Sequence, residues 1–211
     1  MGKRILYIGN KLSKKGITVT SIETLGCFLE TEGFTVYTAS SVKNKVLRLL
    51  DMVFKTFMFS RKVDAVLIDT YSTQNFYFAT AVGNVCRLLK IPYIPILRGG
   101  DLPKRLLKSP SQSKKLFYGA KVNVAPSKYL LETFLDANFK NTICIPNTIE
   151  IEKYPFKKRE GVLPKLLWVR SFAEIYNPFL AIKVLERLKE LYPIATLCMV
   201  CLLYTSDAAD D

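Results

Sequence analysis

The stretch RILYIGNKLSKKG, residues 4–16, joins a short apolar run to a polar loop that contains glycine. The run from Arg4 to Gly9 is almost continuously apolar instead of alternating, which is typical of a strand buried on both faces of a sheet. After the loop, apolar side chains recur at helical spacing, at Ile22, Leu25, Phe28 and Leu29. A strand, a loop and a helix in this order predict the first unit of an α/β sheet.

The same alternation continues along the chain. Further apolar runs cover residues 34–39, 65–69, 93–97, 122–125 and 142–145, and helical patterns separate several of them, for example at 76–89 and 130–135. Repeated strand–helix units are typical of a parallel sheet with helices on both faces. We therefore predict a doubly wound, Rossmann-like α/β domain over residues 1–147.

The pattern changes after Asn147. Residues 148–164 are charged, contain two prolines and predict a linker. A new β-α-β series covers residues 165–200, and because one such unit cannot cover both faces of a parallel sheet, we expect an incomplete second Rossmann-like domain. Residues 201–211 do not fit either pattern and resemble the translated sequencing-adaptor ends of metagenomic reading frames, so we expect them to be non-native.

Composition excludes several classes of chemistry. The 211 residues carry 31 Lys and Arg against 18 Asp and Glu, a formal charge of +13, and contain no histidine. Without imidazole, Ser-His-Asp and Cys-His nucleophiles and HExxH zinc sites are excluded. No apolar run approaches the roughly 20 residues that span a bilayer. The five cysteines lie in apolar segments and predict reduced core thiols in a cytoplasmic protein.

In open α/β sheets, ligands bind beyond the carboxyl ends of the strands, so the loops there are the candidate sites. The loop from Gly9 to Gly16 precedes a helix, whose N-terminus favours an anion, although a turn with solvated lysines explains it equally well. It lacks the GxGxxG and GxxxxGK[ST] spacings of dinucleotide and ATP sites. Residues 69–72 follow another strand, and there we favour capping of the next helix by Asp69 or Ser72.

Two further loops carry an arginine directly after a strand. In the loop Arg98-Gly99-Gly100-Asp101, the glycines permit close backbone approach, the arginine can bind phosphate, and the aspartate can accept from a sugar hydroxyl. We favour a cleft loop here over a structural turn. Arg170 leads to a second helix N-terminus and suits a diphosphate, with a surface salt bridge as the alternative.

Residues 42–62 form a basic amphipathic segment, with an apolar face that includes Leu50 and Phe54. Lys43, Lys45, Arg48, Lys55, Arg61 and Lys62 surround that face. Such a helix can lie on an anionic membrane surface, and a core-facing helix explains the pattern equally well. We disfavour nucleic acid as a partner, because no RNP-type or helix-turn-helix signature accompanies the charge.

Four segments together resemble the retaining glycosyltransferases of the GT-B fold, family 4. They are GAKVNVAPSKYL (119–130), IPNTI (145–149), LLWVR (166–170) and the helix and strand of residues 181–200. The resemblance implies an acceptor-binding first domain and a donor domain that begins at residue 165. It also implies transfer of a hexose, with retention, from a nucleoside-diphosphate sugar to a glycan or lipid-linked acceptor.

By residue, the resemblance implies donor binding by Arg170 and Gly16 and an acceptor cleft at Arg98, Gly99, Gly100 and Asp101. The chain departs from the family at Tyr176, where a lysine is usual, and the family's paired glutamates would lie beyond residue 200. The catalytic residues are therefore unassigned, and we expect this stretch alone not to turn over.

The resemblance implies no metal and no cofactor besides the sugar nucleotide. We expect a cytoplasmic protein, with peripheral attachment to the inner face of the membrane as a further expectation. The alternative function is a non-catalytic α/β module that binds an anionic ligand or a membrane surface.

Overall fold

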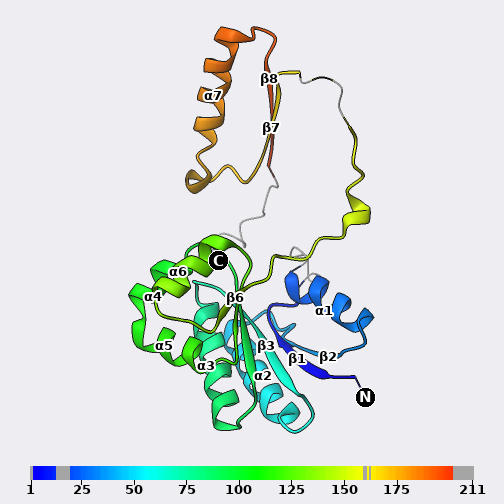
Figure 1. The fold of residues 1–211 in the computed structure, drawn as a ribbon, viewed down its shortest axis with the longest axis vertical. Helices are drawn as coiled ribbons and strands as arrows, with labels where there is room; N and C mark the ends of the chain where they lie inside the picture. The colour runs from blue at the N-terminus through cyan, green and yellow to red at the C-terminus, as the bar shows by residue number, and fades with distance from the viewer. Residues whose placement is uncertain (1, 13–19, 159–160, 162, 202–211) are drawn as a thin grey trace. The chain divides into compact units, whose positions relative to one another are not determined.

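The computed structural model describes residues 2–12, 20–158, 161 and 163–201. Contacts between residues divide the chain into two compact units, Met1–Ile149 and Glu150–Asp211, which we call the first and second units (Figure 1). The break falls inside the segment expected as a linker.

The first unit contains a six-stranded sheet in the order β2-β1-β3-β4-β5-β6, with every neighbouring pair parallel. Its strands are β1 (Arg4–Ile8), β2 (Thr35–Ala39), β3 (Ala65–Thr70), β4 (Tyr93–Leu97), β5 (Asn123–Ala125) and β6 (Thr142–Cys144). The parallel α/β sheet predicted from the apolar runs is confirmed.

Helices connect these strands and cover both faces of the sheet. They are α1 (Ser21–Thr31), α2 (Lys45–Phe59), α3 (Asn75–Leu88), α4 (Leu102–Lys108), α5 (Pro110–Tyr118) and α6 (Lys128–Asp136). Successive strand residues point to opposite faces. In β1, Tyr7 packs with Ile22 of α1 on one face, whereas Leu6 and Ile8 join the larger core of the other face, to which α2 and α3 contribute. The near-continuous apolar runs thus reflect burial on both faces.

Local sequence signals fix where several helices begin. Asn44 caps α2, because its side chain accepts hydrogen bonds from the backbone N–H groups of Val46 and Leu47. Thr20 and Glu23 form a capping box at the start of α1. Gly33 follows α1 with a φ of +85°, a conformation that glycine adopts without steric cost.

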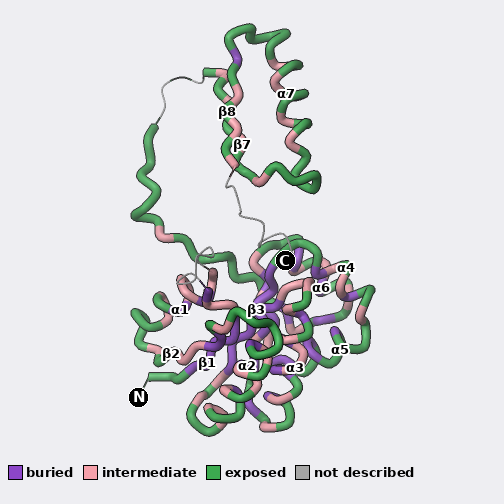
Figure 2. The backbone as a smooth tube through the Cα atoms, turned by 180° about the vertical axis from the view of Figure 1, so that it is seen from behind, coloured by how far each residue is buried: buried purple, intermediate pink, exposed green. Residues whose placement is uncertain are grey.

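The second unit contains a two-stranded parallel sheet, β7 (Lys165–Val169) and β8 (Thr196–Val200). The helix α7 (Pro178–Leu191) joins them, and two short 3-10 helices, η2 (Ile151–Lys153) and η3 (Glu174–Tyr176), complete the unit. The second unit is coloured almost throughout as exposed or half-buried (Figure 2). Among its described residues only Ala195 is buried, and large apolar side chains such as Phe179 and Ile194 are exposed. One β-α-β unit does not bury its own apolar surface.

The cysteines depart from the sequence expectation. All five are free thiols, but only Cys86 lies in the core, whereas Cys27, Cys144 and Cys198 are exposed. Apolar neighbours in the sequence were a poor guide, because Cys144 and Cys198 lie on strands whose faces are incompletely covered.

Candidate functional site at the carboxyl ends of the strands

The strand order of the first unit reverses between β1 and β3. From β1 the chain runs outward to β2 and then returns through α2 to β3, on the other side of β1. At such a switch point the loops after the two strands diverge and leave a crevice for a ligand. The switch point here lies at Gly9 and Asn10 on one side and at Asp69 to Tyr71 on the other.

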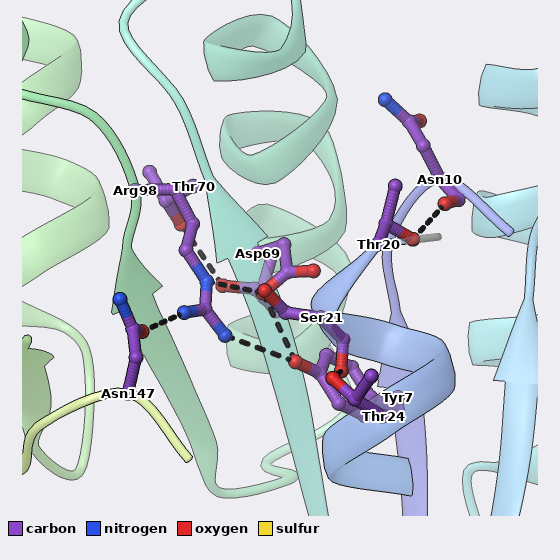
Figure 3. A network of polar contacts seen from close by, with 10 residues as sticks. Tyr7, Asn10, Thr20, Ser21, Thr24, Asp69, Thr70, Arg98 and Asn147 are labelled. Atoms are coloured by element: carbon purple, nitrogen blue, oxygen red, sulfur yellow. Dashed lines mark hydrogen bonds and ion pairs between the residues drawn. The ribbon is translucent and has the colours of Figure 1, made fainter. Parts of the chain in front are cut away.

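A buried polar network lies beside the switch point (Figure 3). The Arg98 Nε donates to Asp69 Oδ1 at 3.0 Å, and the Tyr7 hydroxyl donates to the same oxygen at 3.1 Å. A second nitrogen of Arg98 lies 3.4 Å from the Tyr7 hydroxyl, and a third donates to the side-chain oxygen of Asn147. The guanidinium of Arg98 thus joins four parts of the unit, which are β1, β3, the loop after β4 and the segment after β6.

Burial controls the ionisation of this network. The side chain of Asp69 is 1% exposed and that of Arg98 is 10% exposed. Burial raises the pKa of the Asp69 carboxyl, while Arg98 and the Tyr7 hydrogen bond oppose the rise. Burial also raises the pKa of Tyr7, so its hydroxyl stays protonated. For Arg98, burial alone would lower the pKa, but Asp69 and Tyr7 outweigh it and raise the pKa, which keeps the guanidinium charged.

Among the residues that the structure describes, the second oxygen of Asp69 has no hydrogen-bond partner. Oδ2 is buried, and a Cβ on Gly9 would approach it to 2.8 Å. Because Gly9 has no side chain, the backbone of the loop after β1, which we call the first loop, can lie beside this carboxylate. A buried, unsatisfied acceptor is costly, and a ligand hydroxyl or an ordered water could satisfy it.

A shallow pocket opens at the switch point. Asn10, Asp69, Tyr71 and Asn75 line it with polar side chains, and the apolar lining comes from Ile8, Met52, Ile68, Phe78 and Ala79. Apolar walls with a few convergent polar groups are typical of small-molecule sites.

The first loop is held from several sides. The Asn10 carbonyl accepts from the Thr20 hydroxyl at 2.6 Å, and its side-chain oxygen accepts from Arg48 at 3.1 Å. The Lys11 backbone N–H donates to the Ser40 carbonyl at 2.9 Å. Gly16, expected in this loop as a donor-binding residue, lies outside the described residues.

Asp69 does not cap the following helix, so the capping interpretation is wrong. Gln74 occupies the N-cap of α3 without a side-chain cap, and Asp69 binds Arg98 and Tyr7 instead. The ion pair forms because Asp69, the last residue but one of β3, is in register with Ile96 of the neighbouring strand, which brings Arg98 alongside. A carboxylate and a guanidinium at the ends of two successive apolar runs were the signal for this pair.

The loop after β4 presents its members differently. Arg98 points into the network, and its three guanidinium nitrogens donate hydrogen bonds to Asp69, Asn147 and Tyr7 of the same unit. Gly99 has a φ of +84°, and apart from the adjoining residues no described atom lies within 4 Å of where a Cβ would stand on Gly99 or Gly100. Asp101 pairs with Lys104 at 3.1 Å on the surface at the start of α4.

Arg170 follows β7 in the second unit. Its backbone N–H donates to the Val200 carbonyl at 3.2 Å, and its guanidinium carbon lies 5.1 Å from the ring centre of Tyr176. The arginine thus stacks on the aromatic residue that departs from the family pattern. Asn177 then caps α7 from a left-handed conformation, with a φ of +45°.

Sequence reasoning missed Tyr7 and Asn147 as members of the network. Tyr7 lies in an apolar strand and signals nothing on its own, whereas Asn147 ends the IPN segment. Within the described part of the chain, no three His, Cys, Asp or Glu side chains gather as metal ligands. In the same part, no helix is both long and apolar enough to cross a bilayer.

No protein-family model and no curated protein matches the chain. Among solved structures, the chain is similar to a candidate UDP-N-acetylglucosamine 2-epimerase from Listeria monocytogenes, with 12% identity and a TM-score of 0.55 over 99% of this chain. The chain spans 65% of the length of that protein. It is also similar to the glycotransferase of kitacinnamycin, with 13% identity and a TM-score of 0.47 over 100% of this chain and 68% of the other. At 12% identity, the likeness to the epimerase shows a shared fold and nothing more.

Proposed function

We propose that the chain belongs to a retaining GT-B glycosyltransferase, which moves a hexose from a nucleoside-diphosphate sugar to a glycan or lipid-linked acceptor. The fold shared with a candidate sugar-nucleotide epimerase supports this class of substrate. Because the chain spans 65% of that protein's length, the activity is proposed for the whole protein to which these residues belong.

The observation that carries the proposal is the unsatisfied Asp69 Oδ2 at the switch point. Its partner oxygen is fixed by Arg98 and Tyr7, so the carboxylate is held in one orientation. A carboxylate accepts hydrogen bonds only, and sugar hydroxyls donate them. The first unit would therefore bind a hydroxylated acceptor next to Asn10 and Asn75, which line the same pocket.

The acceptor cleft would also include Arg98, Gly99, Gly100 and Asp101. Arg98 would act by holding Asp69, because its own donors already have partners. Gly99 and Gly100 would allow the acceptor to approach the backbone closely.

The second unit would contact the donor through Arg170, and Gly16 would add a backbone contact from the first loop. A guanidinium that stacks on Tyr176 is oriented in advance for a diphosphate, and its charge would stabilise the leaving nucleotide. No residue is assigned to the chemical step.

The test measures binding and transfer in the whole protein with a panel of nucleoside-diphosphate sugars. Thermal shift identifies the donor, and proton NMR of the product reads its anomeric configuration. Arg170→Ala should weaken donor binding by about 10- to 100-fold, the value of a charge-assisted hydrogen bond. Arg187→Ala is the matched control, because this arginine of α7 is exposed and pairs with the nearby Glu190.

The outcomes separate the two candidate functions. Binding of a sugar nucleotide that Arg170→Ala weakens and Arg187→Ala does not would support the transferase. Absence of binding across the panel would refute it and would favour the non-catalytic binding module. A product with inverted configuration would refute retention while leaving the substrate class in place.

A further inference from the structure

The outward face of α2 is apolar. Val46, Leu50 and Phe54 are 68%, 58% and 64% exposed, and the other exposed apolar side chains of the helix are Leu47, Phe57 and Met58. At about 100° per residue, these six positions fall within a sector of about 120°. We call this set the α2 outer face.

The opposite side of α2 holds the helix on the sheet. Its buried residues are Arg48, Met52 and Thr56, whose mean direction lies about 180° from the centre of the outer face. Arg48 donates to the carbonyl groups of Val42 and Lys43, at 2.7 and 2.8 Å, as well as to Asn10. The helix therefore buries an arginine that donates three hydrogen bonds, together with Met52, and exposes the six apolar residues of the outer face.

This orientation corrects the expectation for residues 42–62. The core-facing alternative required the apolar face to be buried. Val46, Leu50, Phe54 and Phe57 of that face are exposed, and Leu49 and Val53 are half-buried. Arg48, counted from the sequence among the cations around that face, is only 7% exposed and points inward, so it does not contact a membrane from this position.

The charges around the outer face are positive except for one. Lys43 and Lys45 are exposed at the start of α2, and Arg61 and Lys62 are exposed just beyond its end. The only acidic residue in the segment, Asp51, pairs with Lys55 at 3.2 Å. Cations therefore frame an apolar strip on a helix about 22 Å long.

We propose that the α2 outer face docks this protein on an anionic lipid bilayer, with the helix lying in the plane of the interface. Acyl chains would cover the apolar strip, and anionic headgroups would pair with the four framing cations. A second copy of the chain fits less well, because it would bring an equally basic surface against this one. The proposal concerns α2 alone and does not rest on the proposed transferase activity.

The test is co-sedimentation of the full chain with vesicles of phosphatidylcholine containing phosphatidylglycerol, compared with pure phosphatidylcholine, at low salt. We expect binding to the anionic vesicles that weakens as salt is added. Leu50→Ser/Phe54→Ser should reduce the partition coefficient by at least about tenfold, because two apolar anchors are lost. Lys43→Gln/Lys45→Gln should reduce it by about fivefold for each lysine.

Matched controls distinguish binding by the α2 outer face from nonspecific hydrophobic or electrostatic binding by other surfaces. Leu107→Ser/Tyr129→Ser removes exposed apolar side chains from α4 and α6, and Lys114→Gln/Lys140→Gln removes two exposed lysines elsewhere in the first unit. Both should bind vesicles more tightly than the corresponding α2 variants. Because the substituted residues are exposed, thermal unfolding of every variant should stay close to that of the wild type.

Three results would overturn the proposal. One is a lack of binding to anionic vesicles at low salt. Another is a loss of binding in the control pairs equal to that in the α2 pairs. The third is self-association without vesicles that Leu50→Ser/Phe54→Ser abolishes, which would identify the outer face as a protein interface.

Discussion

Replacing Arg98 by methionine tests whether the buried ion pair holds the switch point together. The two charges lie 3.0 Å apart, with side chains 10% and 1% exposed. At an effective dielectric constant of about 20, their attraction is about 5 kcal/mol. The substitution leaves the Asp69 carboxylate buried, with Tyr7 as its one remaining partner among the described residues, so we expect the free energy of unfolding to fall by about 3–5 kcal/mol at neutral pH.

The pH dependence of this variant has a definite sign. Arg98 is the positive charge that opposes the rise that burial causes in the pKa of Asp69, and the variant loses it. The folded state then keeps a proton over a range of pH in which the unfolded state has lost it. Stability should therefore fall, more steeply than in the wild type, as the pH rises from about 4 toward the raised pKa.

Urea unfolding followed by circular dichroism at about pH 5 and pH 7.5 measures both effects. Lys104→Met is the matched control, because it breaks an ion pair of similar length, with Asp101, whose side chains are 84% and 56% exposed. An exposed pair contributes little. Asp69→Leu/Arg98→Met completes a double-mutant cycle and should cost less than the sum of the single changes. The reasoning is refuted when Arg98→Met costs no more than Lys104→Met or is insensitive to pH.

Two further predictions concern the same unit. Gly9→Ala places a Cβ 2.8 Å from Asp69 Oδ2 and should lower the free energy of unfolding, measured in urea, by about 1–3 kcal/mol. Gly26→Ala is the control, because no described atom outside α1 lies within 4 Å of its Cβ, and it should stabilise α1 by up to about 1 kcal/mol. Equal effects would contradict the close approach at Gly9. Burial raises the pKa of Cys86 to about 12 from 9.0, and that of Tyr93 to about 12 from 10.0. The folded state therefore keeps both of these protons, and that of Tyr7, longer than the unfolded state, so stability should fall by about 5 kcal/mol between pH 8 and pH 11. Cys86→Ala should reduce that fall by about half, and an unchanged slope would contradict the prediction.

The network explains why the first unit tolerates polar groups inside its sheet. A buried carboxylate alone would be costly, but Arg98 and Tyr7 satisfy one oxygen and keep the other oriented toward the loop after β1. Asn147 extends the same contact to the segment after β6. The polar interior of this sheet is therefore concentrated where a ligand would need it.

The α/β class and the positions of the strands could be read from the sequence because they depend on local periodicity. The strand at 93–97 has the predicted bounds, since a continuous apolar run is a local signal. The exposed position of the apolar residues of α2 could not be read in the same way. Periodicity marks an apolar stripe but does not say whether a neighbour covers it.

The amino-acid order alone therefore determined which segments became strands and helices, and that the sheet is parallel. Only the tertiary structure decided that Asp69 meets Arg98, 29 positions later, and that α2 turns Arg48 inward and Phe54 outward. Both arrangements depend on the order of the strands and helices in space, which places residues distant in sequence side by side. The neighbours then supply the hydrogen bonds that offset the cost of burying a charge.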